Sequence, residues 1–162
     1  MAEMQIRPAT ESDCPAIALL RLEGLATLSA LAPAGFGTEV YDKKLLPVFE
    51  NELAEACADP DCDLLVAESA GQLLGFVIAV VEQHSDELVE APYITVQNIG
   101  VTRTHRNQGI ARLLKTAVED AAKRRGITTI DALVWETNTA MQALNESLGY
   151  TTLERRMVKR LK

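Results

Sequence analysis

The stretch Ile99-Gly100-Val101-Thr102-Arg103-Thr104-His105-Arg106-Asn107-Gln108-Gly109-Ile110-Ala111 decides the fold of this chain. A short apolar run ends here, an arginine-containing loop follows, and a helical pattern begins after Gly109. From that glycine the apolar residues recur with the spacing of one buried helical face. They are Ile110, Leu113, Leu114, Ala117, Val118 and Ala121. Basic residues at 123–125 favour the last helical turn, and Gly126 favours the position after it. The pattern predicts a strand, a tight loop and an amphipathic helix over 110–125.

The loop before this helix has the chemistry of an anion site. It lacks acidic side chains, and it has a glycine where backbone can approach a ligand closely. A helix N-terminus offers unpaired N–H groups and the positive end of the helix dipole, which suit a phosphate or pyrophosphate. About six consecutive amides from Asn107 could surround a pyrophosphate, with added charge from Arg106 and Arg112. The alternative for so short a motif is an ordinary capping turn with a solvated arginine.

The segment Arg106-Asn107-Gln108-Gly109-Ile110-Ala111 resembles motif A of the GCN5-related N-acetyltransferase (GNAT) superfamily, which reads Arg/Gln-x-x-Gly-x-Gly/Ala after an apolar strand. Residues 4–13, 138–150 and 157–161 resemble, in the same order, its opening strand, closing motif and last strand. The resemblance implies an α/β (mixed α+β) fold in a single domain over 1–162. We expect a central mixed, splayed sheet of about six to seven strands flanked by about four helices. The residue pattern predicts a first helix that ends near Glu23 and two strands joined by a turn at Ala70-Gly71. It also predicts strands over 129–135 and 153–161.

The same resemblance implies an N-acetyltransferase that moves the acetyl group of acetyl-CoA to a primary amine by direct attack in a ternary complex. In the superfamily the pantetheine arm pairs with strand backbone, here that of Ile99, Gly100 and Val101. An amide near Val101 would hold the developing oxyanion. The residues expected to bind the cofactor are Ile99, Gly100, Val101, Arg106, Asn107, Gln108, Gly109, Ile110, Ala111, Arg112 and Asn138. For Asn138, a simple helix N-cap is the alternative.

Two positions depart from the superfamily pattern. The closing motif usually has a tyrosine that protonates the departing sulfur, and here that position is Asn145. It lies on the apolar stripe of its helix, so we expect it to face inward and to need a hydrogen-bond partner. Many relatives carry an acidic residue on the strand before motif A, where this chain has Gln97 and Asn98. These carboxamides could hold a water that relays a proton. We take Val101, Asn145, Gln97 and Asn98 as the candidate catalytic residues.

Other side chains remain as alternatives for proton transfer. Glu82, His84 and Glu136 are possible bases at strand ends, although solvated surface explains each of them. Tyr150 and Tyr93 are the alternative proton donors. The departures also leave open a second function, an acyl-CoA-binding sensor or interaction module with weakened or absent catalysis.

Charge is divided unevenly along the chain. Residues 1–100 carry four Lys or Arg against seventeen Asp or Glu, a net charge of −13, whereas residues 101–162 carry twelve against six, a net charge of +6. This division favours a polyanionic cofactor on the C-terminal half and a cationic amine, small molecule or peptide, on the N-terminal half. Solvated helix faces would produce the same division. Phe36 and Tyr41 could line an acceptor pocket or form a small satellite core.

Composition bounds the class of protein. The 162 residues are 48% hydrophobic and 24% charged, as expected for one globular domain, and the overall charge of −7 disfavours a nucleic-acid partner. No apolar run approaches the length of a membrane span, and the start lacks a basic segment before an apolar one. We expect a cytoplasmic monomer or homodimer that does not bind membranes. Cys14, Cys57 and Cys62 lack metal-type spacing, so free thiols and no metal site are expected.

Overall fold

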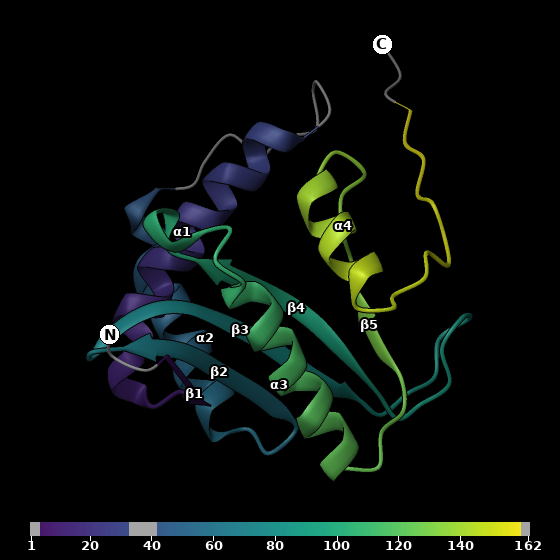
Figure 1. Cartoon of the computed structure of the whole chain (residues 1–162), viewed down its shortest axis with the longest axis horizontal. Helices are drawn as coiled ribbons and strands as arrows, with labels where there is room; N and C mark the ends of the chain where they lie inside the picture. Colours follow the sequence, from purple (N-terminus) through teal and green to yellow (C-terminus); the bar gives the residue numbers. More distant parts are fainter. Residues whose placement is uncertain (1–3, 33–41, 160–162) are drawn as a thin grey trace.

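The computed structural model describes residues 4–32 and 42–159 (Figure 1). Within these ranges it has one five-stranded sheet and four α-helices. Their order is β1 (Gln5–Pro8), α1 (Cys14–Leu31), α2 (Leu46–Ala58), β2 (Cys62–Ser69), β3 (Gln72–Glu82), β4 (Tyr93–Val101), α3 (Ile110–Arg124), β5 (Ile130–Ala132) and α4 (Thr139–Ser147). Strands β1 to β4 pair antiparallel with their neighbours, and β5 lies parallel to β4. The mixed α/β fold is therefore present.

Helices cover both faces of the sheet (Figure 1). Helix α3 packs on one face, where Leu114 and Val118 meet Val77 and Ile94 of the strands, all of them fully buried. Helices α1 and α2 cover the opposite face with Ile17, Leu53 and Phe76 in the core. Burial of apolar surface on both faces gives the two hydrophobic clusters that hold the layers together.

Helix α1 is longer than its sequence pattern predicts. The pattern ends the helix near Glu23, but the structure continues it to Leu31. Gly24 does not stop the helix, because the Ala and Leu residues after it favour helix strongly. The helical stretch Glu11–Leu31 has a mean hydropathy of 1.4, so by length and composition alone it could cross a membrane, contrary to the expectation. A core helix and a signal sequence near the N-terminus both pass the same test, and 22% of the tested window is buried here, including Ile17 and Ala18.

In the part of the chain that the structure describes, the sheet has five strands instead of six to seven. A final strand was expected over 153–161, but residues 151–159 form neither strand nor helix and are exposed, and 160–161 lie outside the described residues. Leu153, Met157 and Val158 are 60% exposed or more. An alternating pattern forms a strand only where a neighbouring edge accepts its hydrogen bonds. The expected strand over 129–135 is also shorter, since β5 covers only Ile130–Ala132.

The short β5 leaves part of β4 unpaired. The two strands pair at Ile94, Thr95 and Val96 of β4, opposite the three residues of β5. In the described ranges no strand pairs with residues 97–101 of β4 on the β5 side. The backbone that the sequence assigns to the pantetheine arm is therefore a free strand edge, which is the geometry that an added extended chain can pair with.

A β-bulge in β4 changes which face its side chains reach. Ile78 of β3 pairs with Asn98 and Ala79 pairs with Val96, so Gln97 is the extra residue of the bulge. Val96 and Ile99 both belong to the cluster beneath α3, with two residues between them instead of one. Gln97 and Asn98 consequently both lie on the α1–α2 side of the sheet. Bulges often redirect side chains in this way at functional sites.

Candidate active site

The loop between β4 and α3 has two residues in the left-handed backbone region. Asn107 has φ 60° and Gly109 has φ 82°, and α3 begins immediately afterwards at Ile110. A Cβ atom placed on Gly109 would meet nothing within 4 Å, so the space beside this glycine is open. Left-handed residues next to a helix start turn successive N–H groups toward one concave surface.

The backbone amides of this loop are free to bind a ligand. The first backbone hydrogen bond of α3 runs from the Leu113 N–H to the Gly109 carbonyl at 3.0 Å. Within the described ranges, the amides of residues 107–112 donate to no backbone carbonyl. Arg106 Nε donates to the Val101 carbonyl at 3.2 Å and fastens the loop to the end of β4. The expected row of about six amides is therefore compatible with the structure and forms a concave site for an anion.

The side chains of the loop set its charge and its outer surface. Arg106, Asn107 and Gln108 are exposed, whereas Ile110 is buried and offers only its backbone to a ligand. The first turn of α3 has no acidic residue. Arg112 is exposed and donates to Ser147 Oγ at 2.6 Å, which ties α3 to the end of α4. The site is positive from both the helix dipole and its arginines.

Asn138 serves as the N-cap of α4. Its side-chain oxygen accepts a hydrogen bond from the Met141 N–H at 3.3 Å. This confirms the capping role that the sequence left as an alternative. Its contact with the cofactor stays a prediction.

Asn145 faces inward, as its place on the apolar stripe predicts. It is 7% exposed, and its Oδ1 atom has no hydrogen-bond partner among the described residues. A buried carbonyl oxygen without a donor costs free energy unless a ligand or water completes it. Asn145 is therefore placed to receive a hydrogen bond from something that the chain itself does not supply.

The structure also buries a lysine that the sequence reasoning missed. Lys115 of α3 is 1% exposed, and its Nζ atom lies 4.5 Å from the centroid of the Tyr150 ring. Burial lowers the pKa of Lys115 to about 8, and the carboxylate of Glu119 partly opposes this effect. Burial likewise raises the pKa of Tyr150 to about 12, and its hydroxyl has no hydrogen-bond partner in the described ranges.

Several alternative proton carriers lie at the wrong end of the sheet. Glu82 pairs with Tyr93, and both lie at the end of the β3–β4 pair opposite Val101. Eight strand residues separate Tyr93 from Val101, roughly 26 Å along β4. His84 follows Glu82 in the chain and lies at the same distant end. These three side chains therefore do not reach the Val101 end of β4, where the amide for the oxyanion is expected.

Glu136, the remaining candidate base, follows β5 and lies at the correct end of the sheet. It forms an ion pair with Arg155 at 3.3 Å, in which both side chains are more than 70% exposed. An exposed ion pair of this kind contributes little to the stability of the fold.

Phe36 and Tyr41, which could line an acceptor pocket or form a small satellite core, lie outside the described residues.

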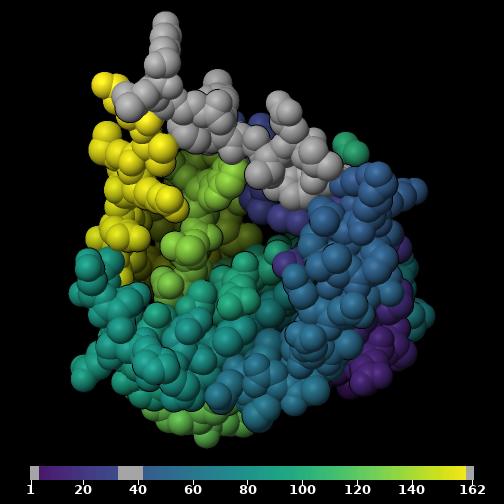
Figure 2. Space-filling model, turned by 180° about the vertical axis from the view of Figure 1, so that it is seen from behind, coloured from purple at the N-terminus to yellow at the C-terminus, as the bar shows by residue number. Residues whose placement is uncertain are grey.

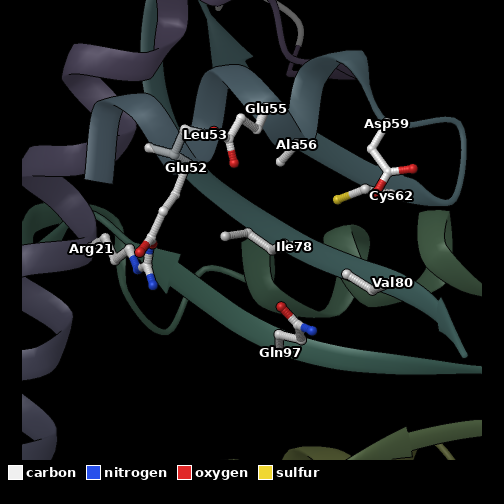
Figure 3. A pocket seen from close by; sticks show the side chains of 10 residues that line it. All are labelled: Arg21, Glu52, Leu53, Glu55, Ala56, Asp59, Cys62, Ile78, Val80 and Gln97. Atoms are coloured by element: carbon white, nitrogen blue, oxygen red, sulfur yellow. The ribbon is translucent and has the colours of Figure 1, made fainter. Parts of the chain in front are cut away.

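Gln97 lines a cavity between α1, α2 and the sheet (Figure 3). The cavity measures about 250 Å³. Its polar lining includes three carboxylates from α2 and its end, Glu52, Glu55 and Asp59. Arg21 is the basic side chain in this lining, and Glu52 accepts from its Nη1 at 2.6 Å. The cavity is therefore negative overall, opposite in sign to the loop before α3.

The surface behind the view of Figure 1 is hollowed. Figure 2 shows this hollow between the teal strands and the yellow-green α4. The amide row follows the end of β4 along the chain, and Gln97 of the acidic cavity lies in the part of β4 that β5 leaves unpaired, so both adjoin the free edge of this strand. Such an arrangement suits two substrates that meet across a strand edge.

A model of the GNAT acetyltransferase family matches residues 23–150. The chain therefore belongs to the GNAT family of acetyltransferases. Among curated proteins, none matches it.

Several solved structures share its fold. The aminoglycoside antibiotic 6'-N-acetyltransferase AAC(6')-IG from Acinetobacter haemolyticus is 21% identical, with a TM-score of 0.74 over 98% of each chain. AAC(6')-Iy, in complex with the bisubstrate analogue CoA-S-monomethyl-acetylneamine, is 19% identical, with a TM-score of 0.73 over 99% of each chain. A mutant of the BH1408 protein from Bacillus halodurans is 18% identical, with a TM-score of 0.79 over 98% of this chain and 99% of that one. At these identities the likeness concerns the fold.

Proposed function

We propose that this protein is an acetyl-CoA-dependent N-acetyltransferase that acts on a primary amine. The observation that carries the proposal is the row of unpaired amides at 107–112, fastened by Arg106 beside the free edge of β4. The amide row fits a pyrophosphate, and the free edge fits the amide groups of a pantetheine arm. Family membership and the CoA complexes of similar structures support the same cofactor.

The residues of this chain would divide the work as follows. The loop 107–112 with Arg106 holds the pyrophosphate, and the β4 edge from Ile99 to Val101 aligns the arm. Bound acetyl-CoA supplies an activated acetyl group. The amide near Val101 stabilises negative charge on the carbonyl oxygen. Gln97 and Asn98 hold a water on the α1–α2 side, which removes a proton from the attacking amine.

The function is tested by thiol release from acetyl-CoA across a panel of amines that includes aminoglycosides, the acceptors named for similar structures. The proposal expects release that depends on both the protein and one class of amine. Tight CoA binding without release for any amine would favour the sensor or interaction module instead. Absence of CoA binding would contradict both functions.

The acidic cavity and the −13 charge of residues 1–100 support a cationic acceptor. We expect kcat/KM for the best amine to fall as salt rises from low to physiological concentration. The reason is that the Debye length shortens from ~30 Å to ~8 Å and long-range attraction weakens. Steady-state kinetics at several ionic strengths measure this effect. The control is an amine that carries a net negative charge at neutral pH. A flat response, or an anionic best substrate, would contradict a cationic acceptor.

Asn145→Ala is expected to lower kcat by less than about tenfold. The substitution removes at most one neutral hydrogen bond to the bound cofactor, worth ~1 kcal/mol, because Asn145 Oδ1 has no partner among the described residues and the carboxamide is not an acid. Single-turnover kinetics separate this step from cofactor binding. A fall of a hundredfold or more would show that the carboxamide does more than form one hydrogen bond.

A further inference from the structure

The C-terminal segment, residues 151–159, lies on the surface as unpaired backbone. All of its residues are exposed, and it forms neither strand nor helix. Within the described ranges its N–H groups and carbonyls make no hydrogen bond to other backbone. Three of its side chains are large, apolar and at least 60% exposed, namely Leu153, Met157 and Val158. Single exposed apolar residues are ordinary, but three within six residues of unpaired backbone indicate a segment that lacks a partner.

Strand β5 has an open outer edge. It is the last strand in the order of the sheet, with β4 on one side, and in the described part of the chain no strand pairs with its other side. Leu133 and Trp135, which follow β5, are 82% and 41% exposed. An open strand edge beside exposed apolar side chains is a surface to which an extended segment can add as a further strand.

The C-terminal segment passes β5 of its own chain without pairing with it (Figure 1). Leu153 lines a groove together with Thr128 and Thr129, which precede β5. Arg155 forms its ion pair with Glu136, which follows β5. The segment therefore runs in the same direction as β5. Among the described residues no ladder joins the two between these contacts, so the edge of β5 stays available.

The segment and the surface beside β5 carry opposite charges. The groove near the start of β5 measures about 330 Å³, and its lining includes Leu88, Pro92 and Glu90. These residues belong to the loop 83–92, which has three acidic residues and no Lys or Arg. The C-terminal segment has three basic residues and one acidic residue. Complementary charge of this kind speeds the encounter of two surfaces and fixes how they align.

One chain contains both halves of this interaction, so a second copy can supply what the first lacks. When a two-fold axis crosses the C-terminal segments at right angles, the segments of the two copies run antiparallel to each other. Each then enters antiparallel to β5 of the other copy, and the contact is the same in both directions. Antiparallel pairing is slightly more stable per residue than the parallel pairing open to β5 within one chain.

We propose that this protein is a homodimer in which the C-terminal segment of each copy adds as an antiparallel strand to the open edge of β5 in the other. The apolar side chains of the segment cover Leu133 and Trp135, and its basic side chains approach the loop 83–92. The dimer also fixes the segment that borders the hollow of Figure 2, where it is drawn in yellow. The proposal does not depend on the reaction proposed above.

The first test is the dissociation constant of the dimer, measured on the full chain by sedimentation over a range of concentrations. We compare the wild type with Met157→Pro and Val158→Pro. Successive N–H groups point to opposite edges of a strand, so at least one of these prolines removes a ladder hydrogen bond and should raise the dissociation constant tenfold or more. Val158→Thr is the matched control, because it keeps the N–H group and the branched side chain. Both positions are exposed outside any helix or strand, so the fold of each copy should persist, which circular dichroism checks.

Charge reversal tests which surface receives the segment. Arg156→Glu with Lys159→Glu reverses the segment, and Glu87→Lys with Glu90→Lys reverses the loop. Each pair of substitutions should weaken the dimer at low salt, and the four together in one chain should restore it, because opposite charges then face each other again.

Hydrogen exchange of the amides at 153–158 distinguishes a second copy from the same chain. We expect protection in concentrated samples that is lost on dilution. Protection that does not change with concentration would show that the segment pairs within its own chain, and it would overturn the proposal. A wild type that is monomeric at every concentration would also overturn it. A dimer that neither proline nor either charge reversal weakens would show that another surface forms the contact, with the same consequence.

Discussion

Lys115→Met should raise the free energy of unfolding by about 2 kcal/mol at neutral pH. Burial that lowers the pKa of Lys115 from 10.5 to about 8 corresponds to a cost of about 3 kcal/mol for the charged amine. The Tyr150 ring, 4.5 Å from Nζ, offsets about 1 kcal/mol of that cost. Methionine fills a similar volume without charge. Thermal unfolding should show a midpoint higher by roughly 4–8 °C.

The gain in stability should depend on pH in a defined direction. Below pH 8 the lysine is protonated in both folded and unfolded chains, so the difference between variant and wild type is constant. Between pH 8 and 10.5 the unfolded wild type binds more protons than the folded one, so its stability rises and the difference shrinks. Urea unfolding at several pH values measures this, with Lys123→Met as the control. A Lys115 variant that is less stable than the wild type at pH 7 would contradict the predicted cost.

Gly109→Glu should weaken CoA binding by well over tenfold. The new side chain enters the open space beside the loop, and its negative charge faces the place assigned to the pyrophosphate. Each tenfold loss of CoA affinity corresponds to about 1.4 kcal/mol of binding free energy. The repulsion between the new carboxylate and the pyrophosphate at the helix N-terminus adds to the steric exclusion by the side chain. Isothermal titration calorimetry with CoA measures the effect.

Gly126→Glu is the matched control for this substitution. Gly126 has φ +72° against +82° for Gly109, and a Cβ at either glycine meets nothing within 4 Å. Both variants therefore carry the same kind of backbone strain and the same charge, but at opposite ends of α3. Equal CoA affinity in the two variants would contradict the prediction that the loop is the anion site.

The parts of the fold that local patterns determine were predictable. The apolar spacing after Gly109 gave α3, and the turn at Ala70 and Gly71 between alternating segments gave the β2–β3 hairpin. Two limits depended on tertiary contacts instead. The end of α1 at Leu31 lies beyond Gly24, and the segment 151–159 has a strand pattern without a strand partner. The alternation of apolar and polar residues shows which face of a segment is apolar. It does not show whether the edge of a neighbouring strand is free to pair with that segment.

The part of the candidate site that backbone groups form was predictable from the sequence. Motif A located the loop and its amides, and the apolar stripe of α4 placed Asn145 inside. Lys115 was missed because helical periodicity assigns a lysine to solvent, and its burial depends on α4 and Tyr150, which are distant in sequence. The bulge at Gln97 had one visible signal, the two successive polar residues between Val96 and Ile99.

The bulge gives β4 one residue more than its partner strand without turning the later side chains over. Gly100 faces Phe76, and a Cβ on Gly100 would come within 2.6 Å of Phe76 Cε1. Deleting Gln97 would restore regular alternation and leave Ile99 in the α3 core, because Asn98 alone would then separate Val96 from Ile99. A deletion beyond the bulge would instead turn the residues that follow it to the opposite face and remove Gly100 from the aromatic ring. A family alignment should consequently accept a one-residue gap at position 97 but none at positions 99 to 101.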